Sequence, residues 1–495
     1  MEEQLNVCLL NDSFPPIIDG VANAVVNYAK NIQRQGGTAM VVTPAYPEAD
    51  DSHWEFPVVR YPAFDVRKVT SGYMVGIPFY PELSSYLSTQ KVDIIHAHCP
   101  MMSAVLGRAL YKRIQAPMIM TYHTKYDVDI ANVVKSKPLQ ASGIKSVVTN
   151  VSSYDEVWTV SHGAGENLRS LGYQGDYIVM PNGVDLSRRE AGPEQVEAVT
   201  RGYDLPEGIP VFLFVGRLMW YKGIRITLNA LRKLKEKDID YRMVIIGSGG
   251  DEEEIKAYTN ALGIEHKVFF TGAITDRERI RAWYTRADLF LFPSTFDSNG
   301  LVVREAAACN LASVLIRGSC AAEGTEDGVN AFLIEETDQS MEGLLMQVIS
   351  HPEKMKETGI HAGKELYLSW EDAVAQAVNR YHVVQELYQS GAYKEHDTFS
   401  DNLLATNGDL MYTVAKVGQA LNQGKVIAQY YFRKIDGSHK VSDAASTFKR
   451  VSKGAGYIET RKQVPSFQIK KKPIRKKTLT KKAGSEKPAE KKNSF

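Results

Sequence analysis

The chain has 495 residues, a net charge of +1 and 44% apolar residues. Its length exceeds one ordinary domain core, so two domains with additions are expected, and the apolar content excludes a chain that is disordered throughout. No apolar run approaches ~18 residues, which argues against a membrane-spanning helix. The first residues are acidic where a secretory signal would be basic, and the four cysteines lack metal-ligand spacing. We therefore expect a cytoplasmic protein with reduced thiols.

Charge is unevenly distributed along the chain. Residues 450–495 carry 15 Lys or Arg and 3 Glu, which is a net charge of +12. Because the whole chain is +1, the remaining residues carry −11. The sequence therefore predicts an acidic body with a basic tail.

Buried strands alternate with helices through the first part of the chain. Apolar segments without alternation indicate strands, and segments with helical spacing between them indicate helices. The predicted strands are 7–10, 40–42, 92–96, 118–121 and 156–160, and the predicted helices are 21–33 and 101–111. This alternation predicts a parallel sheet covered on both faces, in an α/β domain of residues 1–185.

The sequence PNGVD at 181–185 interrupts this pattern with turn residues, and the alternation then begins again. The predicted strands are 211–216, 242–247, 268–270 and 289–292, and the predicted helices are 224–235, 252–262 and 277–286. We assign residues 186–368 to a second α/β domain. Two doubly wound domains joined by a hinge bind ligands in the cleft between them, at the C-terminal ends of the strands.

The chain after residue 368 is predicted to add a helix, an accessory segment and a tail. Ser369 begins a capping-box sequence, SWED, so residues 369–390 are assigned to a closing helix that packs back toward the first domain. An apolar stripe from Leu410 to Leu421 predicts one more helix in an accessory segment, 391–450. Residues 451–495 lack a core-forming pattern and are predicted to be a disordered basic tail.

A strand, a loop and a helix start follow one another at 289–305. The apolar run 289–292 precedes a polar loop with Asp297 and Gly300, and the helix that starts at Leu301 carries Glu305. Free N–H groups at a helix start can hold an anion, and a glycine lets a ligand approach the backbone. We predict that this stretch holds the sugar end of a sugar nucleotide.

Two cations follow the first strand of the second domain, in GRLMWYKG at 216–223. Arg217 and Lys222 would project from the end of the strand into the cleft. An Arg and a Lys can neutralise the charge that grows on a diphosphate leaving group without a metal. Taken alone, the motif is more typical of surface cations at a helix start, but the stretch 297–305 and the domain pattern favour the diphosphate role.

Five motifs in order resemble the retaining glycosyltransferases of family 4, which have the GT-B fold. They are PPIIDG near the start, PNGVD at the domain junction, GR…KG, the two acids separated by seven residues, and SWE before the last helix. Together they span residues 6–388. The resemblance implies two Rossmann-like domains that face each other across a cleft.

The resemblance also implies residue roles. Gly20 would place its backbone against the donor phosphates, and Arg217 and Lys222 would bind the diphosphate. Glu305 would hydrogen-bond the ribose hydroxyls, and Asp297 would face the transferred hexose. The N–H groups of Asn299, Gly300 and Leu301 would complete the anion cradle, and the strand end at 271–274, including Ile274, would hold the base. The chain has Asp297 and Asn299 where the family usually has Glu and Phe.

Histidines provide a further candidate and a competing one. His123 follows a strand of the first domain, and the resemblance implies that it hydrogen-bonds the donor sugar or phosphate across the cleft. Taken alone, His123 is more typical of a core or capping histidine. His96 and His98 share one face of a strand and could mimic a metal site, but no third ligand is evident, so we predict a structural role.

Three other signals are interpreted as structural. Asp127-Val128-Asp129 has the form used by metal-dependent glycosyltransferases of another fold, but it does not end a hydrophobic strand, so we read it as loop acids. The glycines at 247–250 lack the full dinucleotide-binding pattern. Cys309 and Cys320 are interpreted as small buried apolar residues.

These expectations together describe a retaining hexosyltransferase that needs no metal and no cofactor. A nucleoside diphosphate sugar, UDP- or GDP-linked, would donate a hexose to a hydroxyl group. The sequence TYHTKYD with PPIIDG resembles the branch that glucosylates membrane diacylglycerol. The aromatic and basic stretch 60–86 and the tail would contact an anionic membrane from the cytoplasmic side.

Four alternatives remain open at this point. Residues 60–86 could be an ordinary part of the acceptor lobe, and the tail could be merely solubilising. The acceptor could be a soluble or polymeric glycan. The protein could also be a weakly active scaffold that binds a nucleotide sugar and works through its C-terminal extension. Nucleic-acid binding is not expected, because few aromatic residues in the tail could stack on bases.

Overall fold

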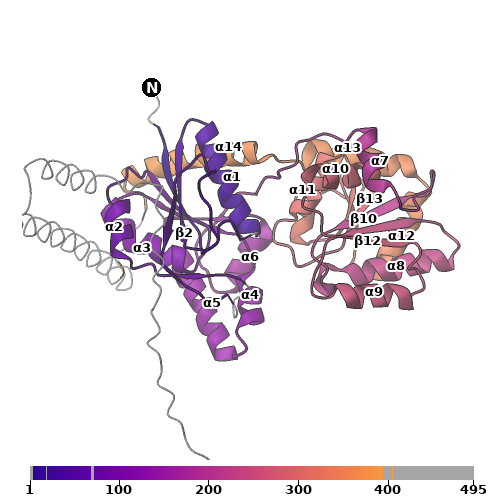
Figure 1. Cartoon of the computed structure of the whole chain (residues 1–495), viewed down its shortest axis with the longest axis horizontal. Helices are drawn as coiled ribbons and strands as arrows, with labels where there is room; N and C mark the ends of the chain where they lie inside the picture. The colour runs from indigo at the N-terminus through magenta and orange to yellow at the C-terminus, as the bar shows by residue number, and fades with distance from the viewer. Residues whose placement is uncertain (1–3, 18, 68–71, 394–403, 405–495) are drawn as a thin grey trace, which may run out of the picture.

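The computed structural model describes residues 4–17, 19–67, 72–393 and Leu404. Two α/β lobes lie side by side, each with a parallel sheet (Figure 1). This confirms the predicted fold class of two Rossmann-like domains. The predicted tail, 451–495, and the apolar stripe between Leu410 and Leu421 lie outside the described residues.

The first lobe contains a seven-stranded sheet in the order β3-β2-β1-β6-β7-β8-β9. All neighbouring strands are parallel. The strands are β1 (Asn6–Leu10), β2 (Thr38–Pro44), β3 (Val58–Tyr61), β6 (Ile94–Ala97), β7 (Met118–Tyr122), β8 (Glu156–Thr159) and β9 (Ile178–Val179). The helices are α1 (Gly20–Arg34), α2 (Pro81–Leu87), α3 (Met102–Ile114), α4 (Tyr126–Val133), α5 (Lys137–Ser152) and α6 (His162–Ser170).

The second lobe repeats this plan with six parallel strands in the order β12-β11-β10-β13-β14-β15. The strands are β10 (Val211–Val215), β11 (Arg242–Ile246), β12 (Val268–Gly272), β13 (Leu289–Phe292), β14 (Ser313–Ile316) and β15 (Phe332–Ile334). The helices are α7 (Pro193–Thr200), α8 (Ile224–Glu236), α9 (Glu252–Ala261), α10 (Arg277–Arg286), α11 (Leu301–Ala308), α12 (Asp338–Ile349) and α13 (Pro352–Glu365), with short 3₁₀ turns η1 (Trp220–Lys222) and η2 (Cys320–Ala322).

The strand order of both sheets reverses at one point. In the first sheet the reversal lies between β1 and β6, and in the second it lies between β10 and β13. The connections leave these neighbouring strands in opposite directions, so a crevice forms beyond their carboxyl ends. Arg217 and Lys222 follow β10, and Asp297 follows β13. The topology therefore brings the two sequence motifs of the second lobe together.

Strands without polar alternation form the cores, because helices cover both faces of a parallel sheet. Strand β10 is buried at all five positions. Apolar side chains from β10, β11, β13 and the helices around them make one cluster that includes Trp283. In the first lobe two clusters lie on opposite faces of the sheet, and Trp158 belongs to one of them.

Helix α14 (Trp370–Gln389) returns from the second lobe to the first, where it packs beside α1 (Figure 1). Ser369 caps the helix by accepting a hydrogen bond from the Asp372 N–H (3.0 Å), as the capping-box sequence predicts. Ser369 also bridges to Val184 of the PNGVD segment. Farther along, Arg380 pairs with Glu156 of β8 (2.5 Å), which fixes the helix to the first sheet.

Two segments contain regular structure that the sequence analysis did not predict. Asp127 and Asp129 lie in α4 and not in a loop. Negative charge in a first helical turn is favourable, and Val128 and Ile130 supply apolar spacing, so the acids suit the helix. The stretch 60–86 is more regular than a loop, because it contains the end of β3, the antiparallel hairpin of β4 (Ala63–Phe64) and β5 (Val75–Gly76), and most of α2.

Candidate active site

Lys222 and Asp297 form a buried ion pair at the strand reversal of the second sheet. Lys222 Nζ lies 2.6 Å from Asp297 Oδ1, and the exposed fractions of the two side chains are 9% and 21%. The Ser294 hydroxyl donates to the other carboxylate oxygen (2.6 Å). The geometry thus joins a cation from the GR…KG motif to the first acid of the other motif. Of the two side chains, that of Asp297 keeps the larger exposed fraction.

A glycine makes this approach of the two loops feasible. Gly223 follows η1 with φ +76°, a conformation that other residues adopt at a cost. A Cβ atom built on Gly223 would lie 1.9 Å from the Pro293 carbonyl oxygen. The loop after β10 can therefore lie against the loop after β13 only because residue 223 has no side chain.

Arg217 is the second predicted cation, and it is exposed. Desolvation raises the pKa of the Asp129 carboxyl in α4, and the positive charge of Arg217 acts in the opposite direction. Arg217 is therefore close enough to the first lobe to influence one of its acids. An exposed guanidinium at this position is well placed to bind an anion that enters between the lobes.

The N-terminus of α11 lies at the same edge of the sheet. Gly300 precedes the helix in the left-handed conformation (φ +60°), and a Cβ atom there would lie 2.9 Å from the Ala321 Cα. No side chain caps this end of α11. Its first N–H groups, including that of Leu301, therefore remain available to an anion, as the sequence predicts.

Glu305, the second acid, is paired with two residues that the sequence interpretation missed. Arg277 Nη2 lies 2.6 Å from Glu305 Oε1, and the Tyr284 hydroxyl donates to Oε2 (3.2 Å). Both partners lie on α10, and Glu305 is only 9% exposed. The sequence could have indicated Arg277, because it lies three residues after Ile274, at the strand end that is predicted to hold the base.

The loop with Asp297 is bound to the first lobe by its own side chains. The Ser298 hydroxyl donates to the His123 carbonyl oxygen (2.8 Å). With its amide oriented to satisfy its neighbours, Asn299 donates to Val160 O (3.3 Å) and accepts from the Asn182 N–H (3.2 Å). The side chain of Asn299, where the family usually has Phe, therefore connects the two lobes. The sequence alone did not indicate this connection.

A second set of contacts connects the lobes at α6. The Glu323 carboxylate accepts from the His162 N–H (2.7 Å) and the Gly163 N–H (2.6 Å) at the start of α6. A negative charge is favourable at a helix N-terminus. The Ser161 hydroxyl donates to Ser298 O (2.5 Å). The structure thus shows the two lobes in contact around the loop of Asp297.

His123 lies at this boundary, but its ring is directed into the protein. Its Nε2 atom is 2.9 Å from His98 Nδ1, and its Nδ1 atom is 3.5 Å from Asn182 Nδ2. The residue is 5% exposed, and burial lowers the pKa of its imidazole to about 3. This differs from the expectation of a ring nitrogen offered to the donor. The reason is that both nitrogens are already engaged within the first lobe.

His96 and His98 are buried beside it. His96 contacts the Tyr381 hydroxyl of α14 (2.6 Å) and the Thr121 hydroxyl (2.7 Å). Burial is the main cause that lowers the pKa of both imidazoles, so neither is charged near neutral pH. Within the described part of the chain no group of three or more His, Cys, Asp or Glu is arranged to hold a metal ion.

The remaining predicted residues occupy the edges of this region. Gly20 begins α1 and has open space around it. The helix start is capped by Asp19, and Asn23 one turn later reaches Asp185 of the PNGVD segment (3.1 Å). Ile274 is half-buried just after β12. Cys309 is buried as expected, and Cys320 is only partly so.

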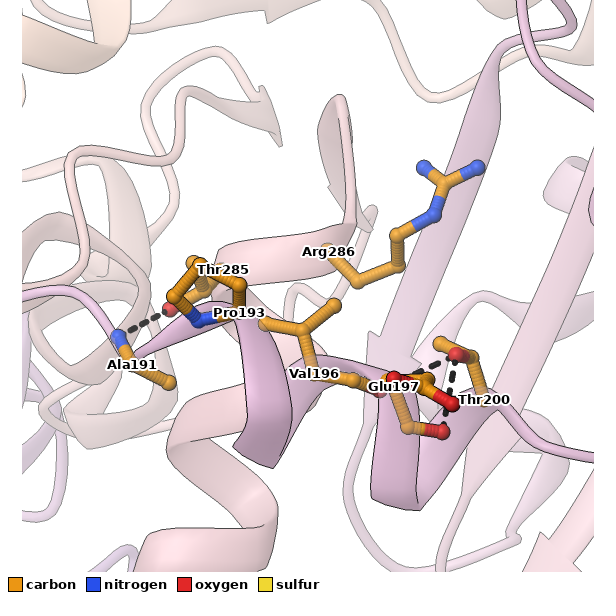
Figure 2. Close-up of a pocket in the computed structure, with 7 residues that line it drawn as sticks. All are labelled: Ala191, Pro193, Val196, Glu197, Thr200, Thr285 and Arg286. Carbon is orange, nitrogen blue, oxygen red and sulfur yellow. Dashed lines mark hydrogen bonds between the residues drawn. The ribbon is translucent and has the colours of Figure 1, made fainter.

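An open groove of about 480 Å³ lies elsewhere, between α7 and the C-terminal end of α10 (Figure 2). Figure 2 shows Arg286 extending away from the other lining residues. None of the predicted site residues lines this groove. It is lined by Ala191, Pro193, Val196, Glu197, Thr200, Thr285 and Arg286.

Two family profiles match the chain in succession. Residues 18–188 match the family described as Glycosyltransferase Family 4, and residues 196–365 match Glycosyl transferases group 1. They cover both lobes and the predicted site residues within them. The chain belongs to the family 4 glycosyltransferases. It is thus a glycosyltransferase with the GT-B fold, as the five motifs indicated.

Named relatives are similar to this glycosyltransferase over most of their length. An alpha-monoglucosyldiacylglycerol synthase of Acholeplasma laidlawii is 23% identical over 69% of this chain and 87% of its own. A GDP-mannose-dependent alpha-mannosyltransferase of Corynebacterium glutamicum is 25% identical over 68% of this chain and 78% of its own. These proteins differ in the sugar that their names specify.

Solved structures share the fold of this glycosyltransferase. The Anabaena protein HepE, determined in complex with UDP and glucose, superposes with a TM-score of 0.60 at 18% identity over 77% of this chain and its own full length. Sucrose-phosphate synthase of Thermosynechococcus elongatus gives 0.64 at 18% identity over 78% of this chain and all of its own. In the described residues, no helix combines the length and apolar character needed to cross a bilayer.

Proposed function

We propose that the protein is a retaining hexosyltransferase that moves a hexose from a UDP- or GDP-linked sugar to a hydroxyl group of a membrane glycerolipid. The ion pair of Lys222 and Asp297, beside the uncapped start of α11, is the observation that carries this proposal. It places a cation, a carboxylate and free N–H groups at one crevice. A nucleoside diphosphate sugar needs such a combination for its phosphates and its hydroxyl groups.

The proposed chemistry depends on stabilising the leaving group. Lys222 and Arg217 would neutralise the charge that develops on the diphosphate as the glycosidic bond breaks. Asp297 would accept hydrogen bonds from the hexose hydroxyls. Because each oxygen of its carboxylate already receives one hydrogen bond, from Lys222 or Ser294, its orientation is fixed in advance.

Retention follows in this proposal from attack on the face that the diphosphate leaves. The acceptor hydroxyl would form the new glycosidic bond there, and a departing phosphate oxygen would take its proton. The two cations supply the positive charge that a metal ion supplies in other enzymes, so we propose transfer without a metal. The first lobe would bind the acceptor, and contact between the lobes would bring the substrates together.

A surface of the first lobe supports a lipid acceptor. Phe64 of β4 is 62% exposed and pairs in register with Val75 of β5, which is 36% exposed. Directly paired residues project from the same face of a sheet, so the hairpin presents both side chains together. Tyr73 nearby is 39% exposed. Apolar and aromatic side chains of this kind suit a membrane interface.

The names of relatives agree with this choice of acceptor. The relative from Acholeplasma laidlawii is named as a synthase of a glucosylated diacylglycerol, and so is one from Streptococcus pneumoniae that is 24% identical. The relative from Corynebacterium glutamicum is named for GDP-mannose. These names support a glycolipid product and a GDP-linked donor for this chain, and the UDP bound by HepE supports a UDP-linked donor.

A transfer assay tests the proposal. Protein is incubated with labelled UDP-glucose, UDP-galactose or GDP-mannose, together with either diacylglycerol in anionic vesicles or a soluble oligosaccharide. We expect labelled lipid with one of the donors, and none with the Lys222→Ala variant. Transfer only to the oligosaccharide would contradict the lipid acceptor. Absence of both transfer and donor hydrolysis would favour a scaffold and contradict the enzyme.

Co-sedimentation with the same vesicles tests the hairpin. The variant Phe64→Ser should sediment less than the wild type, and the variant Leu139→Ser serves as its control. Leu139, 63% exposed on α5, is an equally exposed apolar residue outside the hairpin. Equal sedimentation of the Phe64→Ser variant and the wild type would contradict a membrane role for the hairpin.

A further inference from the structure

The environment of Glu305 indicates how this carboxylate is oriented. Its side chain is 12% exposed, and two residues of α10 contact its two oxygens. Arg277 reaches Oε1 at 2.6 Å, and the Tyr284 hydroxyl reaches Oε2 at 3.2 Å. Tyr284 is fully buried, and burial raises the pKa of its hydroxyl well above the ordinary value, so it remains a donor.

The backbone of Arg277 lies at a capped helix start, and its side chain is 40% exposed. Arg277 is the first residue of α10, whose start is capped by Asp276 through hydrogen bonds from the Glu278 and Arg279 N–H groups (2.9 and 3.2 Å). Although burial opposes it, the neighbouring Glu305 carboxylate raises the pKa of the Arg277 guanidinium. A permanently charged group therefore stands beside a buried acid, which would otherwise lose solvation without compensation.

The hydrogen-bonding capacity of Glu305 is only half used by these neighbours. An ionised carboxylate offers about four acceptor positions, two on each oxygen. Arg277 occupies one position on Oε1, and Tyr284 occupies one on Oε2. One position on each oxygen is left, which matches two adjacent hydroxyl groups that both donate. A ribose diol has this arrangement.

We propose that Arg277 is a positioning residue for recognition of the donor ribose and acts through Glu305. This inference rests on the proposed function, in which Glu305 binds the ribose. The Arg277 guanidinium holds the carboxylate in the orientation that accepts both hydroxyls, and Tyr284 holds the other oxygen. Arg277 itself therefore makes no contact with the ribose, and its effect depends on the presence of the diol.

Binding of UDP and 2′-deoxy-UDP by isothermal titration calorimetry tests this inference, with GDP and 2′-deoxy-GDP as a parallel pair. A hydrogen bond to a charged group contributes about tenfold or more in affinity, so the wild type should prefer the ribonucleotide at least about tenfold. The Arg277→Gln variant should reduce that preference to about threefold or less. Arg277→Lys, which keeps the charge, should restore part of it.

Two comparisons separate a positioning role from a general loss of structure. Arg232→Gln removes the same charge from another Arg–Glu pair of this lobe, Arg232–Glu236 (2.8 Å), and should leave the preference unchanged. The double variant Arg277→Gln/Glu305→Gln should prefer the ribonucleotide no less than Glu305→Gln does, because the two substitutions remove the same interaction. Circular dichroism of each variant verifies that it is folded.

The possible outcomes distinguish the inference from the proposed function. If Arg277→Gln weakens both nucleotides equally and leaves their ratio unchanged, Arg277 does not act through the ribose and the inference is overturned. If Glu305→Gln loses the preference while Arg277→Gln keeps it, the inference about Arg277 is also overturned, but the role of Glu305 in binding the ribose stands. If the wild type binds neither UDP nor GDP, or shows no preference for either ribonucleotide, the assigned role of Glu305 itself fails.

Discussion

Removal of the Lys222 amine should abolish most of the turnover while leaving the protein folded. The Lys222→Ala variant eliminates a cation whose side chain is 9% exposed and whose Nζ lies 2.6 Å from Asp297. Loss of one preorganised charge or donor at a developing anion costs about 100-fold or more in turnover. We therefore expect a decrease of at least about 100-fold in kcat.

The cost in stability follows from the burial of the pair. Exposed ion pairs contribute about 0–1 kcal/mol, and breaking a fully buried one costs about 3–5 kcal/mol. Asp297 remains 21% exposed and keeps the hydrogen bond from Ser294, so an intermediate loss of about 2–3 kcal/mol is expected. Urea unfolding measures this loss, and it shows whether the variant is folded under the assay conditions.

A substitution at another paired lysine serves as the control for Lys222→Ala. Lys233 on α8 also pairs with acids, Asp338 and Glu342 (3.1 and 3.5 Å), but its side chain is 28% exposed. Lys233→Ala should leave kcat unchanged and should destabilise the protein less than Lys222→Ala does, because exposed ion pairs contribute little. The reasoning is refuted if folded Lys222→Ala protein turns over within about threefold of the wild type.

Three further perturbations test the site from other directions. Gly223→Ala would force a Cβ atom to 1.9 Å from Pro293 O and should lower the free energy of unfolding by about 3 kcal/mol or more. Gly208 has a similar φ but no atom within 4 Å of the added Cβ, so Gly208→Ala should cost only about 1 kcal/mol, and equal shifts in the melting temperature of the two variants would contradict this. Since the pKa of His123 is about 3 when folded, the unfolded chain binds a proton below about pH 6.5 that the folded chain does not, so His123 alone should lower stability by about 1.4 kcal/mol per pH unit below that value, and the buried His96 and His98 add to this slope. His123→Asn should reduce the slope in urea unfolding, and an unchanged slope would disprove the contribution of His123. Asn299→Ala removes two hydrogen bonds between the lobes and should raise the radius of gyration in X-ray scattering, and identical scattering would exclude a connecting role.

The fold was largely predictable because its signals are local. Uninterrupted apolar runs such as 211–215 indicate strands that are buried on both faces, and each run is followed by a helical pattern. Elements that depend on their neighbours were missed. Strands β4 and β5 have only two residues each and form by pairing with one another, so no periodicity marks them. Helix α4 was hidden because its acids resemble a loop motif.

The candidate site was predictable where its residues follow strands. Lys222 and Asp297 are 75 residues apart, and the sequence placed both after strand ends that face the cleft. The structure adds that their strands, β10 and β13, are neighbours. Pairings between side chains of different elements could not be read in this way. Arg277 on α10 and Glu305 on α11 meet only through their side chains in the folded structure. The ring of His123 is directed inward because His98 lies beside it, which spacing along the chain does not reveal.

The stereochemistry of the product tests the central claim most directly. A donor of known anomeric configuration is supplied with the acceptor that reacts in the transfer assay, and the new glycosidic bond is examined by proton NMR early in the reaction. Attack from the face that the diphosphate leaves predicts a product with the configuration of the donor, which is α for UDP-glucose or GDP-mannose. An inverted, β-linked product would contradict the proposed mechanism.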